Sequence, residues 1–193
     1  MSANRLAESE ANLTKSSVPP DTFLQPDEAI KAAERAIQQT GMLEWPQCAI
    51  LRNPGISPQA PMLTRESSDE DGGADTHSFI VPYGLKGEEN GGVPITRLCI
   101  LIDAVSGEFE EVATFGKPVT YLQREAAIRI VASALRTPEN RLQVDDASLM
   151  FQASEITHLR VYPFWRIMVN KHAYYVDQEG KLYNDVPRGK SGS

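Results

Sequence analysis

Apolar residues recur at helical spacing in two stretches of the chain, residues 26–40 and residues 121–136. Proline in the first turn, two acidic residues after it and Gly41 beyond the last residue indicate where the first helix begins and ends. Thr120, followed by Gln123 three residues later, is typical of a capping box at the start of the second helix. The pattern predicts two amphipathic helices, whose buried stripes are Ala29, Ile30, Ala33, Ala36 and Ile37 in the first and Ala127, Ile128, Val131, Ala134 and Leu135 in the second.

Short runs of β-branched and aromatic residues predict strands between these helices and after the second one. The runs are residues 47–52, 77–83, 94–103 and 108–114, and then residues 155–162, 164–170, 172–177 and 181–186. Residues 142–151 show no clear pattern. Residues 53–76 are predicted to form a long loop, whose acidic part, residues 64–76, is either functional or disordered, because loops of this length are uncommon in compact domains.

One turn pattern occurs twice in the chain. Each copy is a β-type run that ends in aspartate, a tight turn with glycine and a second short run, from Asp103 to Gly107 and from Asp177 to Gly180. The aspartate carboxylate accepts hydrogen bonds from the backbone that follows it, and glycine tolerates positive φ where the chain re-enters a strand. Each copy follows one of the two predicted helices, so the pattern predicts two related structural units.

We therefore predict an α+β fold of two tandem units, each of one helix packed on an antiparallel sheet. Both helices are expected on one face, and the two sheets can join into one continuous sheet. The expected boundaries are a disordered N-terminal tail at residues 1–23, a first unit with the acidic insert at residues 24–116, a second unit at residues 117–187 and a frayed C-terminus at residues 188–193.

Three of these segments resemble the PepSY family of small α+β modules. Residues 28–33 (EAIKAA) resemble the family's opening helix, and residues 102–109 (IDAVSGEF) resemble its closing strand, aspartate turn, glycine and short strand. Residues 175–182 (YVDQEGKL) resemble the closing signature more weakly, with a turn that is one residue shorter. Two tandem copies would cover roughly residues 24–186. Known members are mostly exported or membrane-attached, and some are thought to restrain peptidases, so the resemblance implies a small binding or regulatory module.

Composition narrows the classes of partner. The formal net charge is −7 at pH 7, so we expect no binding to nucleic acid or to an anionic membrane, both of which need a basic patch. No apolar run reaches the length of a membrane span, and the first twenty residues are too polar for a secretory signal. Cys48 and Cys99 lie in apolar runs and are expected to be buried free thiols, which favours a cytoplasmic location.

Few residues suggest catalytic or metal chemistry. Asp71, Asp75 and His77 could be drawn as a metal site, but such spacing arises easily by chance in an acidic loop that is rich in glycine. Asp103 and Asp177 are better explained by their turns than as a catalytic acid and base. We therefore expect no catalytic residue, no cofactor and no metal.

Aromatic residues crowd the second predicted unit. Alternate side chains of a strand face opposite sides, so Phe164 and Arg166 should share a face. Aromatic and arginine side chains are enriched at interface hot spots, and the predicted partner-binding residues are Tyr162, Phe164, Arg166 and Tyr174. A core filled from both sides of the sheet is the alternative explanation of the same residues.

The leading prediction is a non-enzymatic regulatory module that binds an unknown protein or peptide on an open sheet face. One alternative is an enzyme or small-ligand-binding protein whose site lies between the two units near His77. The other is a subunit whose exposed sheet forms a homodimer.

Overall fold

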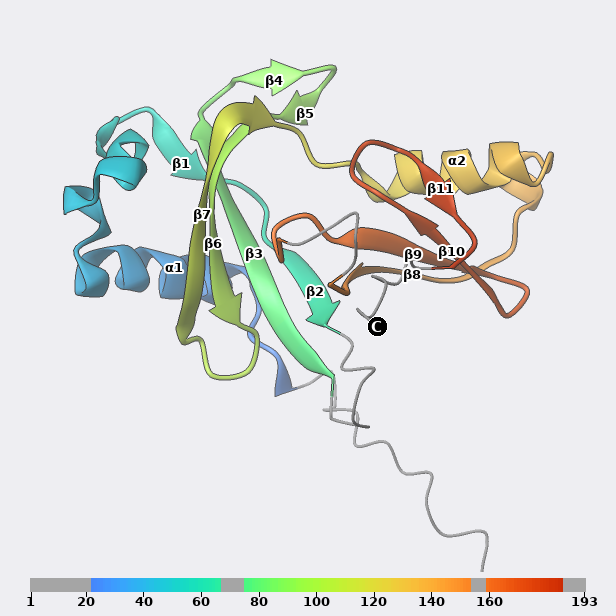
Figure 1. The fold of residues 1–193 in the computed structure, drawn as a ribbon, viewed down its shortest axis with the longest axis horizontal. Coiled ribbons are helices and arrows are strands. Elements are labelled where there is room, and N and C mark those ends of the chain that lie inside the picture. Colours follow the sequence, from blue (N-terminus) through green and yellow to red (C-terminus); the bar gives the residue numbers. More distant parts are fainter. Residues whose placement is uncertain (1–21, 67–74, 154–158, 186–193) are drawn as a thin grey trace, which may run out of the picture.

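The computed structural model describes residues 22–66, 75–153 and 159–185 (Figure 1). The N-terminal part contains one α-helix, two 3-10 helices and seven strands: α1 (Pro26–Thr40), η2 (Met42–Glu44), η3 (Pro46–Arg52), β1 (Ile56–Pro58), β2 (Met62–Glu66), β3 (Thr76–Leu85), β4 (Glu89–Asn90), β5 (Val93–Pro94), β6 (Thr96–Asp103) and β7 (Phe109–Val119). The C-terminal part contains α2 (Arg124–Ala134), η4 (Glu139–Arg141), β8 (Val144–Phe151), β9 (Phe164–Val169), β10 (His172–Val176) and β11 (Leu182–Tyr183).

Nine of these strands form a single mixed sheet. The strand order is β11-β10-β9-β8-β2-β3-β6-β7, and β1 pairs with β3 on the same side as β2. Every pair is antiparallel except β2 and β8, which run parallel at the centre of the sheet. We call β1, β2, β3, β6 and β7 the N-terminal half-sheet and β8–β11 the C-terminal half-sheet. Strands β4 and β5 form a separate two-stranded hairpin.

The prediction of two helix-on-sheet units is therefore wrong. The pairing of β2 with β8 joins all the main strands into one mixed sheet. The predicted unit boundary at Gly116 also falls inside a strand, because β7 continues to Val119. The sequence pattern missed this architecture because β2, which makes the junction, lies within the stretch that was predicted to be a loop.

The two helices cover opposite faces of the sheet, so the prediction that they share one face is also wrong. Paired residues of neighbouring strands point to the same face. Ile167 of β9 lies under α2 and pairs with Ala147 of β8, so Ala147 points to the α2 face. Leu149, two residues further along β8, points to the same face and pairs with Thr64 of β2. Thr64 pairs with Ser78 of β3, so Ser78 also points to the α2 face. The next residue, Phe79, points to the opposite face, where it lies under α1. Figure 1 accordingly shows α1 beside β3, β6 and β7, and α2 over β9 and β10.

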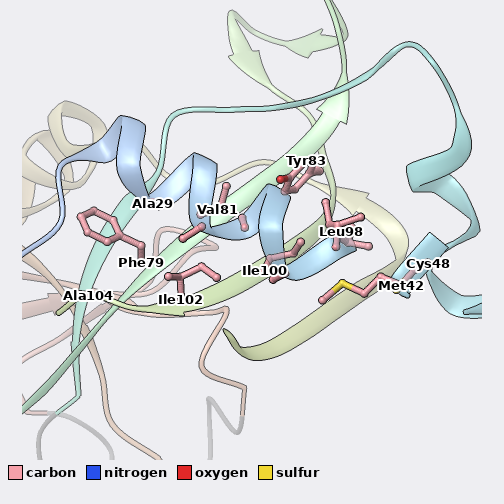
Figure 2. Close-up of a cluster of buried hydrophobic side chains, with 14 residues drawn as sticks. Ala29, Met42, Cys48, Phe79, Val81, Tyr83, Leu98, Ile100, Ile102 and Ala104 are labelled. Atoms are coloured by element: carbon pink, nitrogen blue, oxygen red, sulfur yellow. The ribbon is translucent and has the colours of Figure 1, made fainter. Parts of the chain in front are cut away.

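Three clusters of apolar side chains hold this arrangement together. Alanines of α1 bring the helix close to β3 and β6, where it buries Phe79, Val81, Tyr83, Leu98, Ile100 and Ile102 (Figure 2). The apolar stripe of α2 packs on Ile167, Val169 and Val176. On the other face of β3 and β6, Ile80, Cys99 and Leu101 are covered by Tyr121 and Val161. Both faces of β3 and β6 are therefore buried, which explains the uninterrupted apolar run in the sequence of β6.

The ends of α1 are confirmed, whereas the start of α2 is not. Gly41 ends α1 in the left-handed conformation at φ 68°, and Glu28 completes a capping box with Gln25. Helix α2 begins at Arg124 after the N-cap Gln123, so Thr120 does not cap it. The predicted strand at residues 47–52 is wrong as well, because Pro46–Arg52 forms a 3-10 helix that turns Cys48 into the core.

Both predicted aspartate turns are confirmed. The Asp103 carboxylate accepts hydrogen bonds from the N–H groups of Val105 and Ser106 at 2.9 and 2.6 Å. Asp177 accepts from two backbone N–H groups in the second turn, at 3.0 and 2.8 Å. Gly107 and Gly180 have φ values of 73° and 84°. Partial burial by itself would raise the pKa of Asp103, but these hydrogen bonds outweigh it and hold the pKa below its usual value.

The two thiols and the chain ends complete the comparison with the sequence. Cys48 and Cys99 are buried and free, as predicted. The predicted tail reaches too far, because the ring of Phe23 packs against the core and contacts His77. Residues 1–21 and 188–193, and half of the predicted strand at residues 155–162, lie outside the described residues. The described half, residues 159–162, forms a turn, so the strand prediction is wrong there. Within the described part of the chain, no helix is long and apolar enough to cross a membrane.

Candidate binding groove

The two central strands form a fork. Strands β2 and β8 pair only at their C-terminal ends, where Thr64–Glu66 lie beside Leu149–Phe151. Before this contact, Met62 and Leu63 pair only with β3, and residues 144–148 pair only with β9. Within the described residues, the facing edges of these two segments therefore have no strand between them. Both edges still keep strand geometry, because each is hydrogen-bonded to its neighbour on the other side.

A groove of about 540 Å³ opens at this fork. Its walls come from residues 59–63 before and within β2, residues 147–149 of β8, Trp165 of β9 and residues 121–125 at the start of α2. Pro82, Val93, Pro94 and Thr96 close the side next to the N-terminal half-sheet. The volume lies within the range of ligand sites in proteins, roughly 300–1,000 Å³.

Most polar side chains in these walls already have protein partners. The Trp165 indole N–H donates to the Leu122 carbonyl at 2.7 Å. The Gln59 amide donates to the Ile95 carbonyl at 2.8 Å and accepts from the Thr96 hydroxyl at 2.9 Å. The Ser148 hydroxyl donates to Asp146 at 3.1 Å and the Gln123 amide donates to the Tyr121 carbonyl at 3.0 Å. Arg124 and Glu125 bring exposed charged side chains to the rim, at the first turn of α2. The groove thus presents mainly apolar side chains and strand backbone.

Tyr121 links the groove wall to the core. Its hydroxyl donates to the Val161 carbonyl at 2.8 Å. Because a phenol has one proton, the Cys99 thiol must donate in the 3.1 Å contact between its Sγ and the Tyr121 oxygen. Burial raises the pKa of the Cys99 thiol to about 12 despite this hydrogen bond, and burial is also the main reason that the pKa of Tyr121 is raised. Both groups stay protonated at neutral pH and serve as structural anchors.

Arg160 makes a second link across the molecule. Its guanidinium lies 3.1 Å from a carboxylate oxygen of Glu66 and 3.1 Å from one of Glu110. It also donates to the buried hydroxyl of Ser78 at 2.8 Å. The segment that carries Val161 and Arg160 is therefore fixed to β2, β3 and β7, and it holds the two half-sheets in position beside the fork.

The four predicted partner-binding residues do not form one surface. Phe164 and Arg166 share the face of the C-terminal half-sheet opposite to α2, but Phe164 is only 1% exposed and packs against the Tyr183 ring. Arg166 lies 3.4 Å from Asp146 on the same face. Tyr174 points to the other face, towards α2, and Tyr162 packs edge-on against Phe115. Their role in partner binding stays a prediction.

His77 lies away from the groove. Its ring stacks on Phe23 with the centroids 4.6 Å apart, and it does not line the groove walls. Asp75 is ion-paired with Arg65, and Asp71 lies outside the described residues. Among the residues that the structure describes, no cluster of three or more His, Cys, Asp or Glu side chains could hold a metal ion.

The sequence pattern did not predict the residues that build the groove. Met62 and Leu63 lie in the stretch taken as loop, and residues 147–149 lie in the stretch without a clear pattern. The apolar run of Leu149, Met150 and Phe151 is too short to predict a buried strand by itself.

Comparisons of the chain with protein-family models, with curated proteins and with solved structures find no match. The resemblance to the PepSY family stays a prediction.

Proposed function

We propose that this protein is a non-enzymatic binding module that holds a segment of a protein or peptide partner in the groove between β2 and β8. The observation that carries the proposal is the chemistry of the groove walls. The polar side-chain atoms of Trp165, Gln59 and Thr96 form hydrogen bonds within the protein. Below the charged rim of Arg124 and Glu125, what remains for a ligand is apolar contact and strand backbone, which suit a peptide better than a charged metabolite.

The titratable groups of the groove also favour binding over catalysis. A general acid or base needs a pKa near the working pH and reach to the substrate. Tyr121 is the titratable wall residue with a shifted pKa, and that shift is upward, away from neutral pH. Its hydroxyl is already bonded to Val161 and Cys99. Arg124 and Glu125 lie exposed at the rim.

The two tryptophans offer a direct test, because Trp165 lines the groove and Trp45 packs in the α1 core. The protein is labelled with 15N at its tryptophan indoles and titrated with a pool of tryptic peptides from reduced, alkylated serum albumin. We expect the Trp165 indole signal to shift and the Trp45 signal to stay in place.

A pool of nucleotides, amino acids and sugar phosphates provides the matched control. A shift of the Trp165 signal by this pool, without an effect of the peptides, would favour a small-ligand site and contradict the proposal. No response of Trp165 to either pool would remove the groove as the binding site.

A further inference from the structure

Leu63 is exposed in an unexpected place. It lies on β2, in the middle of the sheet, yet it is 38% exposed. A residue on a central strand is normally covered by neighbours on both sides. Among the residues that the structure describes, no strand neighbour covers the side of Leu63 that faces β8, because the two strands have separated at this level.

Within the described residues, two strand edges therefore face each other across the groove, each paired with a neighbouring strand on its other side. On one side are Met62 and Leu63, held in place by pairing with Ile80 and Phe79. On the other side are residues 144–148, held by β9. Unpaired strand edges are templates for another strand, and their backbone groups need no rearrangement to accept one.

From these observations we propose that the partner segment enters the fork as an extended strand, hydrogen-bonded to β2 on one edge and to β8 on the other. This inference rests on the proposed function and names the form of the partner. Five residues of β8 precede its contact with β2, so the inserted strand spans about five residues, or roughly 17 Å, along β8. On the other edge β2 offers two residues, Met62 and Leu63, so the inserted strand pairs with β2 only at the end next to the junction.

The inserted strand also has a defined side-chain pattern. Successive side chains of a strand alternate between the two faces. Those that point to the α2 side meet Met62, Leu149 and Trp165, which favours large apolar residues. Those that point to the other side meet Leu63 and Ser148, which allows small or polar residues. The partner is therefore a segment in which large apolar residues alternate with small polar ones.

Backbone methylation tests the insertion directly. The probe is a fluorescein-labelled heptapeptide in which valine, phenylalanine and valine alternate with serine and threonine. Two variants carry N-methyl groups on the odd or on the even backbone nitrogens, which point to opposite edges of a strand. We expect the full-length protein to bind the parent peptide in fluorescence polarisation, and each methylated set to weaken binding about tenfold or more, because both edges of the inserted strand lose hydrogen bonds.

Two protein variants locate the site. Ala60 is exposed on the groove wall, and Ala60→Trp is expected to weaken peptide binding about tenfold by filling the groove. Ala173 lies on the face of the C-terminal half-sheet opposite to α2, and Ala173→Trp is expected to leave binding unchanged. Circular dichroism of both variants checks that they are folded.

Several results would overturn the inference and are distinguishable from failure of the proposed function. Weakening by only one methylated set means addition to a single edge, and weakening by neither means side-chain contact alone. A scrambled peptide of the same composition that binds as well as the parent contradicts the alternating pattern. In these three cases peptide binding itself stands. Loss of binding in Ala173→Trp but not in Ala60→Trp moves the site to the open sheet face. If neither the probe nor the albumin peptides bind, both proposals fail.

Discussion

Two buried tyrosines with opposite surroundings give a sharp test of the packing described above. Tyr121 is 6% exposed and its hydroxyl bonds Val161 and Cys99, whereas Tyr83 is 3% exposed and its hydroxyl has no hydrogen-bond partner among the described residues. The substitution to phenylalanine removes the same atom at both positions. Burial, and then the nearby Glu34 carboxylate, raise the pKa of Tyr83, so both hydroxyls are neutral at pH 7.

The expected effects differ in sign. Tyr121→Phe leaves the buried Val161 carbonyl without its donor, which costs about 1–3 kcal/mol of unfolding free energy. Tyr83→Phe removes a hydroxyl whose burial without a partner costs about 1–3 kcal/mol, so the variant should be as stable as the parent or more stable by up to about 3 kcal/mol. The two variants should therefore differ by at least about 1 kcal/mol, and by roughly 2–4 kcal/mol if both effects are near their middle values.

Urea unfolding followed by far-UV circular dichroism measures this difference, provided the slope of the transition is the same for both variants. For a chain of this length, 1 kcal/mol corresponds to about 2–4 °C in Tm, so thermal melts give an independent reading. The reasoning is refuted if Tyr83→Phe is the less stable of the two, because the assignment of satisfied and unsatisfied hydroxyls would then be inverted.

Three further predictions concern the rest of the fold. Arg160→Met should lower the unfolding free energy by about 1–2 kcal/mol, and Arg160→Lys should lower it by less. This loss should become smaller in high salt, which screens the ion pairs. Urea titrations that show no loss of stability at low salt would contradict the bridging role of Arg160. Burial and the nearby Arg65 lower the pKa of His77 in the folded protein, so the folded state takes up a proton there less readily than the unfolded chain. The contribution of His77 to stability is therefore complete above the pKa of the unfolded chain, about 6.5, and is lost as the pH falls below that value. His77→Gln should flatten this part of the curve of stability against pH, and an unchanged slope in urea titrations at several pH values would argue against it. Gly84→Ala should destabilise strongly, because the added methyl would collide with the Ile95 carbonyl, and a Tm equal to that of the parent would show that this contact is wrong.

Local chemistry accounts for the elements that the sequence predicted well. The start of α1 depends on Pro26 and its end on Gly41, and both act within one turn of the helix boundary. The aspartate turns depend on hydrogen bonds across two to four residues, from Asp103 and Asp177 to the backbone that follows. Such features can be recognised without knowledge of the rest of the chain.

The elements that were missed depend on distant partners. The sequence of β2, MLTRE, has only two apolar residues, and its strand conformation comes from pairing with β3 and β8. Tyr121 fits a helix by spacing, but its ring is buried against the sheet and its hydroxyl bonds Val161, forty residues away. The helix consequently starts at Arg124. The groove combines several such long-range contacts, so no local pattern could have predicted it.

The fork follows from the way the two half-sheets meet. Each half is an antiparallel meander with its own twist, and the halves touch through only three residue pairs, from Thr64 to Glu66 on β2. Beyond these three pairs no ladder hydrogen bonds hold β2 beside β8, so the two strands separate. The divergence is then fixed by Tyr121 and Trp165, which anchor the linker before α2, and by Arg160, which anchors the segment before β9. A partner strand would find the edges already ordered, so it would lose mainly its own conformational entropy on binding, and short peptides should bind measurably.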